Sequence, residues 1–371
     1  MTAPTVDVGE SVRVIDTPAL VVDLDALERN IAHMAAFARE RGLRLRPHAK
    51  THKCAAIARL QIAAGAVGVC VQKTAEAEAL AVQGIGDLCI TNEVVDAAKL
   101  ARVAALAGRV RLAIAVDSAL GAERLAHALA AAGTTLDVFV EIDVGQGRCG
   151  VPPTQAGALA HQIVAHGLRF AGLQAYHGGA QHLRSAHERE RVVAHAVALA
   201  RAAQASVTAA GLACPLVTGA GTGSFVHEAA SGVYGELQPG SYVFMDRDYA
   251  DNEPTPHAPA FEHALFVKCQ VMSRGASHAV VDAGHNSHAV DSGPPRVWQR
   301  DLEFVNGGDE HGIVRTRGGG ALPALGETLW LVPGHCDPTV NLHERCIAVR
   351  GGLEHGIVEA VWPVDARGCA G

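Results

Sequence analysis

The chain has 371 residues, 49% of them apolar and only 4% aromatic, with a formal net charge of −7 and a pI near 6.3. This length allows two domains or one large barrel with an addition, and the acidic balance argues against nucleic-acid and anionic-membrane partners. The nine cysteines form no Cys-x-x-Cys pair, no uninterrupted apolar run reaches about 18 residues, and the first eleven residues are polar and acidic. We therefore expect a cytoplasmic protein without disulfides, membrane span or signal peptide.

A strand is predicted over 17–24 and a helix over 26–41, after which strands and helices alternate. Near-continuous apolar runs such as 112–116 and 136–140 are typical of parallel strands that helices cover on both faces. Eight strands with seven or eight helices predict an α/β fold, a (β/α)8 TIM-type barrel over 25–257, and a doubly wound sheet is the alternative. The predicted barrel strands are 43–48, 66–72, 87–91, 110–116, 135–143, 168–176, 214–219 and 240–245, and the helices between them include 53–64, 74–83, 94–107, 119–132, 154–166, 186–211 and 225–231.

The pattern changes near residue 258, where strand-like runs begin to follow one another at short intervals between glycine-rich turns. We predict a smaller β domain over 258–371, without a long amphipathic helix, which residues 1–24 join. Its predicted strands are 263–273, 278–283, 302–305, 328–332, 345–350 and 356–362.

Lys50 is the first candidate catalytic residue. It follows the short strand that Pro47 ends, and the carboxyl ends of barrel strands are where such folds place their chemistry. Its neighbours Arg44, Arg46, His48, His52 and Lys53 are cationic or titratable. Crowding by like charge is expected to lower the pKa of Lys50 and leave an amine that attacks carbonyl groups. A solvated basic turn is the alternative.

The loop 218–224 holds three glycines and follows a predicted strand. Backbone N–H groups and the hydroxyls of Thr222 and Ser224 can converge there on one anion, ahead of a short helix. The loop lacks the Gly-Lys-Ser/Thr ending of a Walker loop, and it closes the barrel pattern instead of opening a dinucleotide-binding unit. Together with Lys50 it indicates pyridoxal phosphate, and a flexible loop is the alternative. The segment 240–242 offers further donors at the next strand end.

His335 and Asp337 lie between Pro333 and Pro338 in the predicted β domain. If this backbone is extended, both side chains project to one face and Cys336 to the other. An imidazole and a carboxylate can bind one divalent cation, and the carboxylate favours Mn²⁺, Mg²⁺ or Ca²⁺ over zinc. Cys336 as the ligand would indicate zinc, and a solvated polar turn is the third alternative.

From about residue 17 to residue 368, the ordered motifs resemble one family. The chain is similar to the D-threonine aldolase branch of the alanine-racemase-type, fold-type III pyridoxal-phosphate enzymes, which also holds 3-hydroxy-D-aspartate aldolases and D-serine dehydratases. The matching stretches are Asp16–Pro18, Arg46–Lys50, Gln72–Lys73, Thr91–Val94, Glu141–Gly150, Gln174–Gly178, Gln181–His182, Gly219–Ser224, Glu236–Gln238, Gly240–Tyr242, Asp248–Tyr249, Asp282–Gly284, Asp309–Gly312 and His335–Thr339.

This resemblance implies roles for individual residues. Lys50 would bond covalently to the cofactor, His335 and Asp337 would bind an activating Mn²⁺ or Mg²⁺, and His182 would stand near the substrate hydroxyl as the base. The dehydratases carry Cys in place of Asp337 and use zinc, which disfavours dehydration here. Arg148 and Tyr176 would lie near the cofactor ring, and the remaining residues around the cofactor would be Gln72, Gly219, Gly221, Thr222, Gly240, Ser241, Tyr242 and Tyr249.

The activity that the resemblance implies is metal-activated cleavage of D-3-hydroxy amino acids by a homodimer, with D-threonine giving glycine and acetaldehyde. Cleavage of 3-hydroxy-D-aspartate to glycine and glyoxylate, D-serine dehydration and racemisation are the alternatives on the same scaffold, and a non-catalytic pyridoxal-phosphate carrier is the alternative of another class. One departure from the family pattern bears on the choice of substrate. Many relatives have the sequence Asp-Ala-Gly-Leu-Lys-Ser at the position of Asp282–Ser287, where this chain carries His285 and Asn286 in place of Leu and Lys. The roles of His285, Asn286 and the segment Asp309–His311 are left open.

Overall fold

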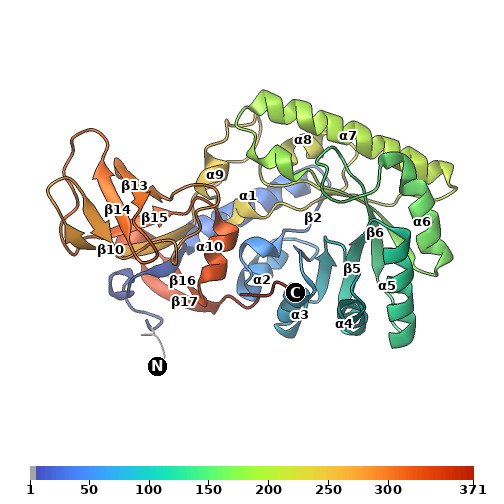
Figure 1. The fold of residues 1–371 in the computed structure, drawn as a ribbon, viewed down its shortest axis with the longest axis horizontal. Helices are drawn as coiled ribbons and strands as arrows, with labels where there is room; N and C mark the ends of the chain where they lie inside the picture. Colours follow the sequence, from blue (N-terminus) through green and yellow to red (C-terminus); the bar gives the residue numbers. More distant parts are fainter. Residues whose placement is uncertain (1–5) are drawn as a thin grey trace.

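Eight parallel strands form the sheet of the larger lobe in the computed structural model, which describes residues 6–371 (Figure 1). From β3 to β9 each strand pairs with the next in sequence, and β9 pairs with β2. A parallel bridge between His48 and Cys70 joins the β2 end to β3, so the sheet curls into the predicted TIM-like barrel. The strands are β2 (Arg44–Leu45), β3 (Val69–Val71), β4 (Asp87–Ile90), β5 (Arg111–Val116), β6 (Asp137–Glu141), β7 (Arg169–Ala175), β8 (Val217–Gly219) and β9 (Glu236–Leu237).

Helices cover the outside of this sheet because each buries one apolar stripe. In the longest, α7, the residues Val193, Ala196, Ala200, Ala203 and Val207 recur at helical spacing and are buried. The length and composition of α7 would allow it to cross a membrane. A core helix meets the same criteria, and one face of α7 packs on α6 and β7, so this is only weak evidence for a membrane span. The helices are α1 (Leu24–Glu40), α2 (Ala55–Ala63), α3 (Thr74–Val82), α4 (Ala97–Ala107), α5 (Ala119–Ala132), α6 (Ala156–Ala165), α7 (Ala186–Ala209), α8 (Phe225–Ala230) and α9 (Arg247–Ala250).

The position of the last barrel strand differs from the prediction. The strand is the two-residue β9, and the predicted segment 240–245 instead contains the 3₁₀ turn Ser241–Val243. Tyr242, Val243 and Phe244 are buried there as part of the core, which explains why an apolar run resembled a strand. The loop after β9 therefore carries Gly240 and Ser241 at the rim of the barrel.

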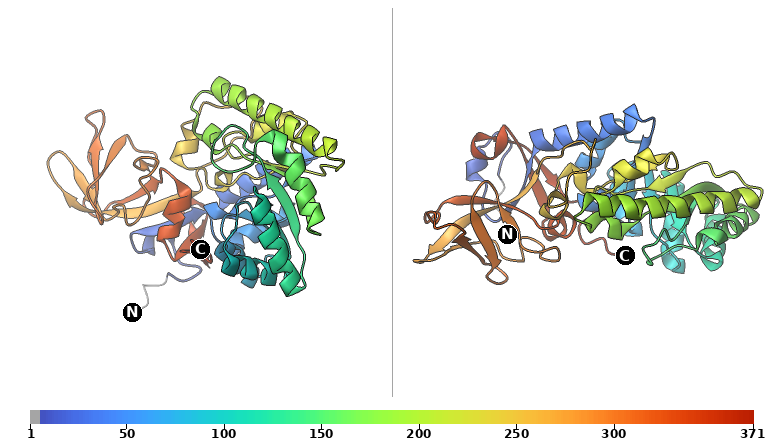
Figure 2. Two further views of the ribbon diagram at one scale, coloured as in Figure 1. Left: turned by 45° about the vertical axis from the view of Figure 1, so that its right-hand side comes forward. Right: turned by 90° about the horizontal axis from the view of Figure 1, so that it is seen from above.

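The smaller lobe is a mixed, mostly antiparallel sheet (Figure 2). Strand β1 (Ala19–Asp23) lies inside it, antiparallel to β10 and parallel to β16, although α1 then returns the chain to the barrel. Of the predicted N-terminal segment, residues 1–5 lie outside the described residues. The other strands are β10 (Leu265–Arg274), β11 (Ala279–Val281), β12 (Arg296–Val297), β13 (Leu302–Asn306), β14 (Gly312–Thr316), β15 (Thr328–Val332), β16 (Arg345–Arg350) and β17 (Ile357–Pro363), with helices α10 (Cys336–Leu342) and α11 (Gly352–His355).

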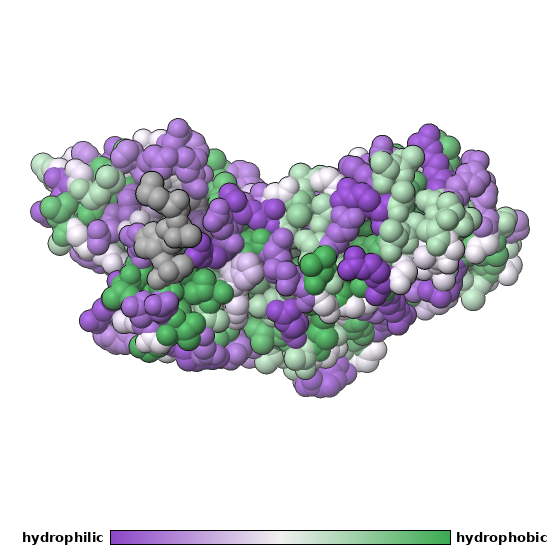
Figure 3. All heavy atoms as spheres, turned by 90° about the horizontal axis from the view of Figure 1, so that it is seen from below, coloured by the Kyte–Doolittle hydropathy of each residue, from purple (hydrophilic) through white to green (hydrophobic). Residues whose placement is uncertain are grey.

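The two lobes share one hydrophobic core cluster as well as chain connections. Leu20 and Val22 of β1 belong to the same buried cluster as Leu27 and Met34 of α1 and Leu237 of β9. The surface seen from below mixes hydrophilic and hydrophobic residues over both lobes (Figure 3). The shared core thus packs the rim of the barrel against the β domain.

Candidate active site

A cavity of about 710 Å³ lies where the rim of the barrel meets the β domain. Lys50 and Gln72 line it from the barrel, and His335 and Asp337 line it from the β domain. A larger cleft of about 1150 Å³ runs along the β domain beside Trp330, but none of the predicted site residues lines it. The chemistry therefore places the candidate site in the smaller cavity.

Lys50 lies in the 3₁₀ turn Ala49–Thr51, and its backbone N–H donates to Nδ1 of His48 over 3.3 Å. Its Nζ atom is 3.2 Å from Oδ2 of Asp337, and its side chain is 40% exposed. The Asp337 carboxylate raises the pKa of Lys50 above its ordinary value against the opposing effect of burial. The prediction of a lowered pKa is therefore wrong for the protein without its cofactor.

The cations that were expected to crowd Lys50 are directed elsewhere. Arg46 pairs with Asp87 and, at 3.3 Å, with Glu236, the first residues of β4 and β9, so its guanidinium lies at the opposite end of the barrel. Arg44 also pairs with Glu236, at 3.0 Å, and Lys53 binds Glu76. Burial and the neighbouring Lys50 hold the pKa of His48 well below its ordinary value.

The metal-binding candidates His335 and Asp337 lie at the start of α10, which corrects the expected extended turn. His335 is the extended residue before the helix, and Asp337 lies in its first turn. The two side chains nevertheless converge, with Nε2 of His335 3.8 Å from Oδ2 of Asp337. Nδ1 of His335 is 2.7 Å from Asp291, an outer carboxylate that fixes the ring and leaves Nε2 toward the cavity.

A divalent cation fits this donor set. Asp337 is 15% exposed at its side chain, and its Oδ1 atom is buried without a hydrogen-bond partner. Burial acts to raise the pKa of Asp337, but Lys50 and His335 bring it down to about 2, so the carboxylate is charged. An unpartnered carboxylate oxygen beside an oriented imidazole is what a bound cation would complete.

Asp246 connects the barrel to these residues. Its carboxylate accepts a hydrogen bond from the backbone N–H of Tyr249 and another from that of Cys336, each over 3.0 Å. The N–H groups of Arg247 and Asp248 donate to the carbonyls of residues 333 and 334. The segment 246–248, which we call the clamp, therefore holds the start of α10 against the barrel.

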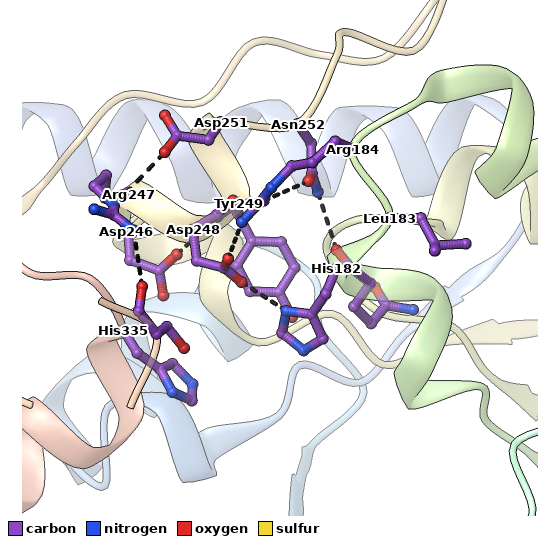
Figure 4. Close-up of polar contacts among 12 residues, drawn as sticks. His182, Leu183, Arg184, Asp246, Arg247, Asp248, Tyr249, Asp251, Asn252 and His335 are labelled. Atoms are coloured by element: carbon purple, nitrogen blue, oxygen red, sulfur yellow. Dashed lines mark hydrogen bonds and ion pairs between the residues drawn. The ribbon is translucent and has the colours of Figure 1, made fainter. Parts of the chain in front are cut away.

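His182 lies on the other side of the clamp, in the 3₁₀ turn Gly178–His182 (Figure 4). Its Nδ1 is 2.6 Å from Oδ2 of Asp248, so this nitrogen carries the hydrogen and Nε2 is the basic one. Burial acts to raise the pKa of Asp248, but hydrogen bonds from His182 and Arg184 lower it to about 2. The ring of Tyr249 lies 5.9 Å from that of His182.

The loops after β8 and β9 offer backbone donors for an anion. The N–H groups of Thr222, Gly240 and Ser241 find no acceptor among the hydrogen bonds of residues 6–371. A Cβ atom on Gly240 would lie 2.6 Å from Oγ1 of Thr51, and glycine is therefore required beside the Lys50 turn. These free donors near a lysine fit the phosphate of pyridoxal phosphate.

The remaining predicted glycines are required by close packing within the protein. A Cβ atom on Gly219 would lie 2.3 Å from the carbonyl oxygen of Ala175, and one on Gly221 would lie 2.5 Å from Oε1 of Gln181. The side chain of Tyr242 does not reach the rim, so only the backbone of this residue can take the place predicted for it around the cofactor. Its hydroxyl is buried beside Gln61, and only its N–H, which donates to Thr222, lies at the rim.

Arg148 and Tyr176 reach the same part of the rim. The guanidinium of Arg148 lies 5.6 Å from the ring centre of Tyr176, and the charges of both residues act on Lys50. Nε2 of Gln72 lies 3.0 Å from Nε2 of His48 and 3.2 Å from Oγ1 of Thr91. The structure thus gathers the polar residues that follow β2, β3, β6 and β7 around one lysine.

Three carboxylates in this site were not predicted as functional residues: Asp246, Asp248 and Asp291. Asp248 has a sequence signal, its place in a matched motif, whereas Asp246 and Asp291 lie outside the matched motifs and become visible only through contacts with residues far along the chain. His285 and Asn286 pair with Asp309 and Glu310 at 2.7 and 2.8 Å, and none of these four residues lines the 710 Å³ cavity.

Comparisons with known proteins agree with this division of the chain. The family "Alanine racemase, N-terminal domain" matches residues 22–248, and the family "Putative serine dehydratase domain" matches residues 264–349. The chain is 45% identical to the D-threonine aldolase of an Arthrobacter species over 98% of this chain and 96% of that protein. It is 44% identical to the 3-hydroxy-D-aspartate aldolase of Paracoccus denitrificans, over 95% and 92%. The crystal structure of D-threonine aldolase from Filomicrobium marinum superposes with a TM-score of 0.95 at 48% identity, covering 99% of this chain and all of that one.

Proposed function

Because the chain belongs to the family of D-threonine and 3-hydroxy-D-aspartate aldolases, we propose that it is a pyridoxal-phosphate-dependent aldehyde-lyase that cleaves D-threonine to glycine and acetaldehyde. One observation carries the proposal. The Lys50 amine lies 3.2 Å from Asp337, which His335 also approaches, and the clamp that holds α10 against the barrel carries Asp248, the partner of His182.

The residues that would hold the cofactor and the cation follow from the geometry. Lys50 would bind the aldehyde of the cofactor, and the free N–H groups of Thr222, Gly240 and Ser241 would bind its phosphate. His335 and Asp337 would hold a divalent cation, which we propose to be Mn²⁺ or Mg²⁺ because a carboxylate is the partner of the imidazole. When bound, the cofactor supplies electron withdrawal from Cα, and the cation supplies a lowered pKa at the substrate hydroxyl.

The protein side chains then have separate tasks. Nε2 of His182 accepts the proton of the substrate hydroxyl while Asp248 holds the ring in the required tautomer and stabilises its charge. Asp291 orients His335 in the same manner, and Arg148 supplies positive charge near Lys50. Racemisation would need a second base facing the substrate, and among the described residues of the cavity we assign none.

The decisive experiment measures acetaldehyde release from D-threonine and from L-threonine, with and without a chelator. We expect release from the D-isomer alone, with loss on chelation and recovery on addition of Mn²⁺. Equal activity on L-threonine, or indifference to chelation, would exclude the proposal. A protein that binds the cofactor and converts no amino acid would restore the non-catalytic carrier.

A second substrate has specific support, because the relative from Paracoccus denitrificans is a 3-hydroxy-D-aspartate aldolase. The same steps on 3-hydroxy-D-aspartate would give glycine and glyoxylate. The two reactions share glycine as one product and differ in the aldehyde released, acetaldehyde or glyoxylate. Measuring release of each aldehyde gives kcat/KM for each substrate, and the larger value identifies the preferred one. The homodimer and the cytoplasmic location stay predictions, which light scattering and cell fractionation can check.

A further inference from the structure

A group of acidic side chains lies on the rim at the ends of β4, β5 and β6, and the aldol chemistry does not use it. Single ligand atoms of Glu93, Asp117 and Cys149 all lie within 4.8 Å of one another. Glu141, the last residue of β6, is 4% exposed and faces the same group, because Glu93 and Asp117 both act on its charge. Three carboxyl groups and a thiol thus share a small region in which Glu141 is buried and the other three residues are half-buried.

The loop after β6 brings Arg148 to this cluster by folding back on the strand. Asp143 accepts hydrogen bonds from the N–H groups of Gly145 and Gly147, and Val151 pairs with the backbone of Glu141 over 2.9 Å. The return of the chain places Nη2 of Arg148 at 4.0 Å from Oε1 of Glu141. At that separation the two groups are neighbours without a close ion pair.

The hydrogen bonding of Glu141 is incomplete unless a proton is present. Its Oε2 atom and Oε1 of Glu93 are both buried and have no hydrogen-bond partner. Two carboxylate oxygens cannot bond to each other, and a buried ionised carboxylate without close partners is costly. One hydrogen between the two oxygens satisfies both, as in carboxyl pairs that share a proton.

We propose that Glu141 is held in its protonated form, donating its carboxyl hydrogen to Glu93, and that this neutral acid positions Arg148 as an uncompensated cation at the barrel rim beside Tyr176. Glu141 is then a positioning residue that acts through Arg148. An ionised Glu141 would draw the guanidinium into a close ion pair and reduce the positive charge that faces an anionic cofactor. This consequence rests on the proposed function, whereas the protonation of Glu141 does not.

The charges around Glu141 agree with this arrangement. Burial and then the neighbouring Glu93 raise the pKa of Glu141 to about 9, with Arg148 opposing them and Asp117 adding to them. The pKa of the Cys149 thiol rises to about 11 through burial and Glu93, so Cys149 also keeps its hydrogen. Glu93 can thus accept from a carboxyl and from a thiol. A metal ion at the same cluster is the competing explanation, and the cation of Arg148 directly beside Glu141 opposes it.

The first test is infrared spectroscopy of the protein without cofactor. We expect the C=O stretch of a protonated carboxyl group at neutral pH, absent from Glu141→Gln and lost from the wild type as the pH rises through about 9. In Glu93→Gln this loss should occur at lower pH, because a neighbouring negative charge is gone. Asp117→Asn, in the same cluster, is the matched control and should keep the band. Identical spectra for wild type and Glu141→Gln would overturn the proposal.

The second test measures cofactor affinity by absorbance titration across pH. The wild type should bind more weakly above about pH 9, Glu141→Gln should bind like the wild type at neutral pH without that alkaline loss, and Glu141→Ala should bind about tenfold more weakly throughout. An alkaline loss that Glu141→Gln retains would contradict the positioning role. A wild type that binds no cofactor would defeat the proposed function and leave the infrared result standing.

A third measurement addresses the metal explanation directly. In a variant that carries both His335→Ala and Asp337→Ala, added Zn²⁺ should leave the infrared band of Glu141 unchanged. If Zn²⁺ binds this variant and removes the band, the cluster is a cation site and the shared proton is excluded. Melting curves of every variant show whether it is folded, and the near-isosteric Glu141→Gln is the variant on which the conclusion depends.

Discussion

The barrel and the β domain contribute to the site in different ways. Lys50, Gln72 and Glu141 follow or end strands β2, β3 and β6, so the hydrogen-bonded sheet sets their positions. His335 and Asp337 instead begin a short helix, and single contacts to Asp246 and Asp291 set theirs. We call Lys50, Gln72 and Glu141 the sheet-built half of the site, and His335 and Asp337 the contact-built half. The sheet-built half should keep its geometry when one neighbouring side chain is lost, whereas the contact-built half should lose its geometry when one supporting carboxylate is removed.

The largest effect should come from the barrel half. Lys50→Ala removes the only amine that we assign to the cofactor aldehyde, and we expect the absorbance of the bound aldehyde to vanish and acetaldehyde release to fall to background. Metal affinity should change little, because His335 and Asp337 are retained. Lys53→Ala is the matched control, since Lys53 is tied to Glu76 and should leave the absorbance intact. An active, coloured Lys50→Ala protein would contradict the assignment.

His182 tests the residue that lies between the two halves. His182→Asn removes the basic nitrogen but keeps a side chain that can reach Asp248, and kcat should fall by about 10²- to 10⁴-fold with little change in KM. Asp248→Asn should also lower kcat, because the imidazole loses the carboxylate that fixes its tautomer. Steady-state kinetics with D-threonine measures both. A change in KM alone would assign His182 to substrate binding.

Asp291 tests the contact-built half. Asp291→Asn weakens the support of the His335 ring, and we expect metal affinity to fall by about 10- to 100-fold. Activity should recover at high Mn²⁺ concentration, which titration with the metal will show. Asn286→Ala, in the same β domain but outside the cavity, should leave the metal affinity unchanged. If both variants bind metal like the wild type, Asp291 does not orient His335.

The clamp should show the smallest effect. Asp246→Ala leaves the N–H groups of Tyr249 and Cys336 without their acceptor, and the free energy of unfolding should fall by about 1–3 kcal/mol. Metal affinity should fall with it, while the cofactor absorbance should persist, because Lys50 lies on the sheet-built half. Denaturant unfolding and metal titration measure the two effects. If Asp246→Ala lowers the affinity for the cofactor as much as the affinity for the metal, the proposed difference between the two halves of the site is wrong.

The same difference explains what could be predicted from the sequence. Apolar runs located most of the barrel strands, because buried parallel strands read as continuous hydrophobic segments. The two-residue β9 is too short for that signal, and α10 is concealed in the sequence because Pro338 suits a turn as well as the first turn of a helix. The pKa of Lys50 was predicted in the wrong direction because its determining neighbour, Asp337, is distant in sequence.

The position of β1 between β10 and β16 has a consequence for biosynthesis. A ribosome releases residues 19–23 long before their partner strands exist, so this apolar segment must wait unpaired until β10 has emerged, and without its second partner, β16, until nearly the whole chain has. The barrel can begin to form in that interval, but the cation-binding half cannot. An interrupted translation product would therefore expose a hydrophobic strand that chaperones and proteases can recognise.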